Sequence, residues 1–209
     1  MAIDSFIKKF RPYADKIAAQ TGINAESILA QAGLETGWNE APKGWNFFGI
    51  KTGKSWTGAR VLIRTKEVLS SPNVSFPKVY SVKKRASDGK YLYDVDDWFR
   101  SYPSPAESFA DWAAVVQRSF PGAWAVRGDK AKFAAALASG GYATGDGYAD
   151  KLLSVLRSVE KRLGAPLTAA VEAVKGKALP LVAMLAAGGV LALFLLSGPS
   201  DLPAKAAKR

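Results

Sequence analysis

The chain has 209 residues, 48% of them hydrophobic, which suits one globular domain with an appendage. It contains no histidine and no cysteine, which excludes Ser-His-Asp catalysis, Cys-His catalysis and any zinc site built from those residues. The formal net charge of +11 favours polyanionic surroundings such as nucleic acid, anionic lipid or an acidic wall polymer, without choosing among them.

Residues 1–163 predict a mostly helical domain. The first nine residues lack the apolar core of a signal peptide. An amphipathic helix is expected over residues 11–21, with Pro12 in its first turn and Gly22 as its stop. The helix would place its apolar residues on one face, toward a core, and its charged residues on the other, toward solvent.

A second helix is expected to begin after Asn24, which can cap it, and to end at about Thr36, with Gly37 just beyond. Residues 38–60 are rich in Gly, Trp and Lys, a composition that favours a loop. This helix and loop contain most of the residues that carry the chemistry considered below.

Residues 60–68 and 90–95 each predict a β-strand. Between them, Pro72, Pro77 and the Asp-Gly pair at 88–89 favour turns. A small β-hairpin lobe is therefore expected in this part of the chain.

Three further helices are expected after the hairpin. A capping box at residues 104–107, with proline at the first helical position, predicts a helix to about residue 119. Asp129 can cap another that runs to about residue 139, and a last helix should cover roughly residues 147–163.

The C-terminal part has a different composition. Residues 164–178 are expected to be a linker, and residues 179–197 form an uncharged stretch long enough to span a bilayer as a helix. A basic tail, residues 198–209, follows. The alternative interpretation of residues 179–197 is a buried core helix, but their terminal position and the two glycines at 188–189 favour a transmembrane helix.

Glu35 is the strongest candidate for a catalytic acid. It lies in the last turn of the predicted second helix, where the negative end of the helix dipole disfavours a carboxylate. Trp38 and Trp45 are close enough in sequence to desolvate it partly, and both effects raise the pKa of a carboxyl group. A general acid needs such a shift, although a solvated surface glutamate near a helix end is the competing interpretation.

Four motifs in order resemble one enzyme family. Residues 30–38, which contain Glu35, are similar to the catalytic-glutamate segment of glycoside hydrolase family 73, the flagellar-type and autolysin-type endo-β-N-acetylglucosaminidases. Residues 46–51 resemble that family's Asn-x-Phe-Gly-Ile-Lys segment, and residues 99–108 its Phe-Arg-x-Tyr segment. Residues 142–152 resemble its closing tyrosine pattern, so the resemblance covers nearly the whole globular part.

The resemblance implies an α+β, mainly α, lysozyme-like fold with a β-lobe closing over a sugar-binding groove. It implies cleavage of the β-1,4 bond after N-acetylglucosamine in peptidoglycan, with Glu35 as general acid and with no metal or cofactor. Residues expected to bind the glycan strand are Trp38, Asn46, Phe48, Tyr102 and Tyr148. The aromatic residues Trp45 and Trp56 are further candidates for stacking on sugar rings, and each is as readily a core residue.

A second carboxylate is expected on the β-lobe, and Glu67 fits the place that the resemblance implies. If Glu67 is a base for water, it should lie about 6.5–9.5 Å from Glu35, whereas a separation near 5 Å would indicate a nucleophile. An exposed strand glutamate is the competing interpretation. Asp94, Asp96 and Asp97 are lower-ranked candidates for the same role.

Tyr142 matches the family's active-site tyrosine. Its phenol is expected to orient a water molecule or to hydrogen-bond the acetamido group of the substrate. The chain departs from the family pattern just beyond it, since Gly145 precedes Asp146 where the aspartate usually follows at once. That departure concerns the local turn more than the tyrosine.

The sequence therefore predicts a membrane-anchored, bacteriolytic peptidoglycan hydrolase. Its partners would be glycan strands and, through residues 179–197, a lipid bilayer, with no specific nucleic acid. A C-terminal anchor suits a bacteriophage enzyme, carried in a virion membrane or made at the bacterial inner membrane. Two alternatives stay open: a lytic transglycosylase, and a catalytically silent wall-binding or membrane-scaffold protein.

Overall fold

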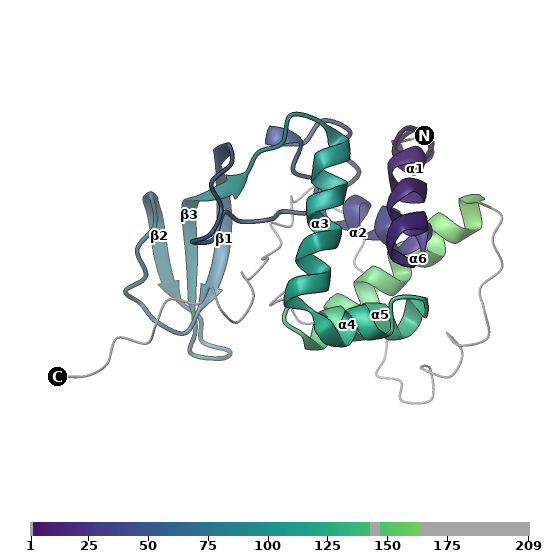
Figure 1. Cartoon of the computed structure of the whole chain (residues 1–209). Coiled ribbons are helices and arrows are strands. Elements are labelled where there is room, and N and C mark those ends of the chain that lie inside the picture. The colour runs from purple at the N-terminus through teal and green to yellow at the C-terminus, as the bar shows by residue number, and fades with distance from the viewer. Residues whose placement is uncertain (1, 143–146, 164–209) are drawn as a thin grey trace.

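The computed structural model describes residues 2–142 and 147–163, with the helices gathered on one side and the strands on the other (Figure 1). In chain order the elements are α1 (Ala2–Thr21), α2 (Ala25–Thr36), the 3-10 turn η1 (Lys43–Trp45), β1 (Arg60–Leu69), β2 (Lys78–Lys84), β3 (Tyr91–Arg100), α3 (Pro105–Ser119), α4 (Pro121–Ala125), α5 (Lys130–Ser139) and α6 (Tyr148–Leu163). This is the mixed α+β, mainly helical fold that the sequence predicts.

The first helix is longer than predicted, because α1 runs through Pro12 instead of beginning beside it. A proline inside a helix costs about 3 kcal/mol, since it removes one hydrogen bond and crowds the preceding turn. The buried face continues across the proline at helical spacing, and burying each large apolar side chain contributes roughly 1.5–3 kcal/mol. Its buried residues are Phe6, Ile7, Phe10, Ala14 and Ile17.

The second helix, α2, has the predicted bounds but a different beginning. Asn24 occupies the N-cap position with extended backbone, yet its side chain caps nothing. Its amide instead donates to the carbonyl of Gly128, 2.9 Å away, and so ties the start of α2 to the loop before α5. At the other end Gly37 adopts the left-handed conformation (φ 59°), as a helix-terminating glycine does.

The predicted hairpin is a three-stranded antiparallel sheet in the described part of the chain, with strand order β1-β3-β2. The extra strand, β2, lies in the segment that the sequence assigned to turns, and the Asp-Gly pair at 88–89 joins it to β3. Its exposed lysines hide its strand character, because an edge strand needs few buried residues. Strand β3 is also longer than predicted and ends at Arg100, directly before the helical domain.

The helical core is rich in aromatic side chains. Phe47 and Phe48, from the loop after η1, are fully buried beside Phe109 of α3. Phe10 of α1 packs on Phe47 with ring centroids 4.5 Å apart. Because helix α2 packs against both α1 and α6, its C-terminal end is held from two sides.

The predicted linker, transmembrane helix and basic tail, residues 164–209, lie outside the described residues. Across 2–142 and 147–163, none of the helices has both the length and the apolar character needed to cross a bilayer.

Candidate active site

Glu35 lies in the last turn of α2, where a sharp chain reversal fixes the helix end. Trp38 has a positive φ of 67° and its backbone N–H donates to the carbonyl of Gly33. The indole then lies over Gly33, so closely that a Cβ on that glycine would be 2.3 Å from the ring. Only glycine fits at position 33, and the tight packing sets the position of the turn that carries Glu35.

Two donors meet one oxygen of the Glu35 carboxyl group. The Tyr148 hydroxyl donates to Oε1 at 3.1 Å, and the Gln31 amide nitrogen Nε2 lies 3.4 Å from the same atom. The Gln31 amide also donates to the Tyr148 hydroxyl at 2.6 Å. Helices α2 and α6 thus bring together three polar groups, two of which are 113 residues apart.

The environment of Glu35 favours the protonated acid. Burial raises its pKa well above the usual range, and the hydrogen bonds from Tyr148 and Gln31 offset part of that rise. Its other oxygen, Oε2, is buried and has no hydrogen-bond partner within the described residues. A carboxyl group that keeps its proton near neutral pH can act as a general acid.

Tyr142 lies beside this cluster. It is fully buried, its hydroxyl donates to the carbonyl of Phe48 at 3.4 Å, and its ring is stacked on Tyr148 with centroids 6.0 Å apart. Burial raises its pKa well above the usual range, and the charge of Glu35 adds to the rise. The predicted turn just beyond it, residues 143–146, is outside the described residues.

Glu67 belongs to a second cluster, on the β-lobe. It is only 2% exposed, so the interpretation as a solvated strand glutamate is wrong. Lys51 lies 2.8 Å from Glu67 Oε2 and 2.9 Å from Asp97 Oδ2, and so bridges the two carboxylates. Burial raises the pKa of Glu67 to about 7, although Lys51 opposes the shift.

The other β-lobe aspartates have outward-facing partners. Asp94 forms a two-pronged ion pair with Arg64, both distances being 2.8 Å. The Tyr80 hydroxyl donates to Asp96 at 3.0 Å. Of the three lower-ranked aspartates, Asp97 is therefore the one that shares a cation with Glu67.

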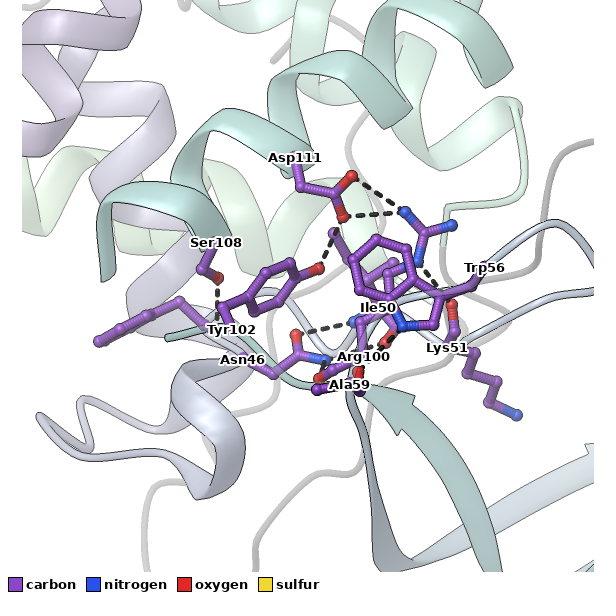
Figure 2. Close-up of polar contacts among 10 residues, drawn as sticks. Asn46, Ile50, Lys51, Trp56, Ala59, Arg100, Tyr102, Ser108 and Asp111 are labelled. Carbon is purple, nitrogen blue, oxygen red and sulfur yellow. Dashed lines mark hydrogen bonds and ion pairs between the residues drawn. The ribbon is translucent and has the colours of Figure 1, made fainter. Parts of the chain in front are cut away.

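The junction between the sheet and the helices is a polar network (Figure 2). The guanidinium of Arg100 contacts both carboxylate oxygens of Asp111, at 2.8 and 3.0 Å, and lies over the ring of Trp56. The Tyr102 hydroxyl donates to Asp111 at 2.7 Å, as the figure shows. Tyr102, predicted to bind sugar, is 5% exposed and uses its hydroxyl to hold this junction.

Asn46 also serves the junction. Its amide nitrogen donates to the carbonyls of Ile50 and Arg100, both at 2.9 Å, and its oxygen accepts from the Ile50 backbone N–H at 2.9 Å. With 6% exposure and three internal hydrogen bonds, the side chain shapes the loop at residues 46–50 from within. Figure 2 shows it between the loop and the end of β3.

The aromatic residues predicted to contact sugar differ in how much of each side chain is exposed to solvent. Phe48 is fully buried and stacks on Trp112 with centroids 4.8 Å apart, so in this structure it has no surface for a ligand. Trp38 is partly exposed and meets Phe6 edge-on in the core, while Trp45 stacks on Phe47. Tyr148 is 3% exposed and contacts Glu35 rather than solvent.

Sequence reasoning missed two residues of these clusters. Gln31 is one helical turn before Glu35, so its spacing of four residues is a signal that the sequence did contain. Lys51 follows the loop at 46–50, and nothing local indicates that it meets a strand residue 16 positions later. Both are polar side chains next to a candidate carboxylate.

Known proteins resemble this chain over most of its described residues. The model of the Glucosaminidase family, described as mannosyl-glycoprotein endo-beta-N-acetylglucosaminidase, matches residues 11–161. The peptidoglycan hydrolase FlgJ of Vibrio parahaemolyticus is 33% identical over 165 residues, which is 75% of this chain and 47% of that protein. The chain therefore spans about half the length of that relative.

Solved structures share the overall fold. A peptidoglycan hydrolase mutant from Sphingomonas sp. A1 superposes with a TM-score of 0.60 at 34% identity, covering 77% of this chain and 98% of that one. The glycoside hydrolase domain of Salmonella typhimurium FlgJ superposes with a TM-score of 0.54 at 26% identity, covering 84% and 94%. The lysozyme-like fold expected from the sequence is thus shared with glycoside hydrolase domains.

Proposed function

The chain belongs to the glucosaminidase family, and from that premise we propose that it hydrolyses the β-1,4 glycosidic bond after N-acetylglucosamine in peptidoglycan. The observation that carries the proposal is the environment of Glu35, a carboxyl group whose Oε2 is buried and whose pKa is raised well above the usual range. Such a group can protonate the oxygen of a departing sugar near neutral pH. The peptidoglycan hydrolases among the similar proteins support the choice of substrate.

In the proposed reaction Glu35 gives its proton to the glycosidic oxygen as the carbon–oxygen bond breaks. Glu67, in its ionised form, takes a proton from the water that attacks the sugar carbon. Lys51 favours that ionised form, and with a pKa of about 7 both states of Glu67 are populated at neutral pH. Two carboxyl groups in different environments can therefore divide the acid and base roles.

Product analysis tests the proposal. Purified peptidoglycan is digested with the full chain, and the products are reduced with borohydride and analysed by mass spectrometry. The proposal expects a reduced N-acetylglucosamine at the new end. A reduced muramic acid end would show that the enzyme cleaves the other glycosidic bond of the glycan strand. An anhydro-sugar end would indicate a lytic transglycosylase. Absence of products would favour a wall-binding protein.

A membrane anchor is a separate part of the proposal. The motivating observation is the uncharged sequence at residues 179–197, which is long enough for a bilayer of about 30 Å. The full chain is expected to stay with membranes during carbonate extraction, whereas a truncation after Gly164 is expected in the supernatant with its activity retained. Full release of the intact chain by carbonate would contradict the proposal that residues 179–197 are a membrane anchor.

The proposed setting is a bacteriophage particle with a membrane, or the membrane of the infected cell, from which the enzyme opens the wall locally. The uncharged stretch at residues 179–197, long enough to span a bilayer as a helix, motivates this choice. Proteomic analysis of purified particles should then find the chain in the lipid-containing fraction. Its consistent absence from such particles would contradict a virion role.

A further inference from the structure

The hydrogen bonds around Glu35 are unequal between its two oxygens. Oε1 faces the Tyr148 hydroxyl at 3.1 Å and the Gln31 amide at 3.4 Å, whereas the buried Oε2 has no partner in the part of the chain that the structure describes. We propose that Gln31 and Tyr148 are positioning residues that hold the acid proton of Glu35 on Oε2, the oxygen that delivers it to the departing sugar. This inference rests on the proposed function.

The direction of each hydrogen bond follows from the donors available. The Gln31 amide nitrogen carries two hydrogens, one for the Tyr148 oxygen at 2.6 Å and one toward Glu35. Since the Tyr148 oxygen already accepts from Gln31, its single hydrogen is directed to Glu35 Oε1. Two hydrogens therefore point at Oε1, and a third one bound to Oε1 would be repelled by both.

Packing keeps these donors in place. Gln31 is fully buried and Tyr148 is 3% exposed, so bulk water does not compete for their hydrogen bonds. The Tyr148 ring is stacked on Tyr142, with an angle of 19° between the planes. The arrangement thus joins α2 to α6 and does not depend on a surface side chain holding one rotamer.

In the reaction the two oxygens of Glu35 have different roles, since Oε2 delivers the proton and Oε1 accepts the hydrogen bonds that stabilise the resulting charge. The proton on Oε2 has no internal acceptor in the described residues, and Oε2 is buried in this structure. A glycosidic oxygen therefore becomes its acceptor once a bound glycan strand opens the site as far as Oε2. As the proton moves to that oxygen and the glycosidic bond breaks, Glu35 becomes a carboxylate. The donors on Oε1 then stabilise the new charge, because hydrogen bonds to an ionised group are stronger than those to a neutral one.

The same donors set how the acid responds to pH. The pKa of Glu35 is raised by burial and lowered by Tyr148 and Gln31, so loss of either donor raises it further. The titratable groups that face Glu35 from other segments are Tyr148 and Tyr142, and burial raises the pKa of both, so they stay protonated. Because a general acid works while protonated, the alkaline limb of kcat/KM follows its pKa in the free enzyme.

The test compares Tyr148→Phe and Gln31→Met with the wild-type full chain. Each variant is expected to lower kcat about tenfold, as the loss of one hydrogen bond to an ionised group does, and to move the alkaline limb to higher pH. Tyr102→Phe is the matched control, because it also removes a buried hydroxyl bonded to a carboxylate, but at the sheet–helix junction. Its alkaline limb should coincide with that of the wild type.

A second measurement does not depend on turnover. With ¹³C at the glutamate carboxyl carbons, the Glu35 resonance is identified by its loss in Glu35→Gln and titrated in each folded variant. An upward-shifted Glu35 titration in Tyr148→Phe and Gln31→Met supports the inference, and an unshifted one in either folded variant overturns it. If Tyr148→Phe does not fold, Gln31→Met decides.

These outcomes separate the inference from the function on which it rests. An inactive Glu35→Gln together with unshifted titrations in the two variants leaves the proposed function standing and removes the positioning role. A folded Glu35→Gln variant with wild-type activity would contradict the proposed function itself, because that function needs Glu35 as the acid.

Discussion

The two candidate catalytic carboxyl groups, one on each lobe, are held in opposite ways. Glu35, on the helical side, meets two neutral donors, Tyr148 and Gln31, and no cation contributes to its pKa. Glu67, on the sheet, is bridged by Lys51 to Asp97. Burial raises the pKa of both, but only Glu67 has a positive charge that favours ionisation.

Because the two carboxyl groups have different partners, a protein without histidine can provide both a proton donor and a proton acceptor. A neutral hydrogen-bond donor lowers the pKa of a buried carboxyl group only in part, whereas a lysine 2.8 Å away adds a positive charge that favours the ionised carboxylate. The helical lobe thus favours a group that gives a proton, and the sheet a group that can accept one.

The largest effect is expected from Glu35→Gln. The amide keeps the shape of the side chain but has no acidic proton, so wall cleavage should fall by about 10²–10⁴. The measurement is the initial rate of release of soluble fragments from purified peptidoglycan. Glu107→Gln is the control, because Glu107 is an exposed glutamate in another family-like motif, and its partner is the helix-capping Ser104.

Next is the choice between the two carboxylates that share Lys51. If Glu67 is the base, Glu67→Gln should slow turnover by about 10², while Asp97→Asn should have a smaller effect. Both variants keep one carboxylate beside Lys51, which makes them a matched pair. Rates are compared at equal folded fraction, measured by near-ultraviolet circular dichroism. The reverse order of effects would assign the base to Asp97.

A third prediction concerns stability and pH. Since burial raises the pKa of Glu67 to about 7 in the folded state, its contribution to stability is fully present below about pH 4.5 and is lost as the pH rises through 7. The loss should amount to about 3 kcal/mol, because each unit of pKa shift corresponds to about 1.4 kcal/mol.

Urea unfolding of the wild type and Glu67→Gln at pH 4.5 and pH 8 measures this loss. The wild type should lose more unfolding free energy than the variant between the two pH values, because the glutamine does not titrate. Glu35 is present in both proteins and cancels in the difference. Parallel pH dependence would mean that Glu67 is not held with a raised pKa.

The smallest effect is expected from Tyr142→Phe, which removes a hydroxyl near Glu35 whose hydrogen bond to the carbonyl of Phe48 is long, at 3.4 Å. Turnover should fall about tenfold and the free energy of unfolding by less than about 1 kcal/mol. Tyr102→Phe should do the opposite, losing about 2 kcal/mol of stability with the junction hydrogen bond to Asp111. A wild-type turnover number in Tyr142→Phe would make Tyr142 a packing residue.

The sequence by itself determined the helices with strong local signals. Ser104 caps α3, since its hydroxyl oxygen accepts from the backbone N–H of Ala106, but the reciprocal bond of the predicted capping box is replaced by a contact of the Ser104 hydroxyl with the Glu107 carboxylate. Asp129 caps α5 through two backbone N–H groups, and Gly37 ends α2. These features depend on residues within one turn of each other, so local chemistry suffices.

Position within a motif also made Glu35 the candidate acid, because its place at a helix end and the family-like order of the motifs can both be read along the chain. The extension of α1 through Pro12 and the edge strand β2 could not be predicted in this way. For α1, packing of its buried face outweighs the proline penalty. For β2, the mostly exposed residues give no alternating pattern of burial, and pairing with β3 makes the segment a strand.

Only the tertiary structure decided which polar groups meet. Tyr148 reaches Glu35 across 113 positions, and Lys51 joins Glu67 to Asp97 from a loop. Phe48 and Tyr102, which the sequence offered as sugar contacts, are buried by the core and by the sheet–helix junction. The physical reason is that burial and hydrogen-bond partners depend on the packing of separate elements, whereas residue type and spacing fix only what each element can offer.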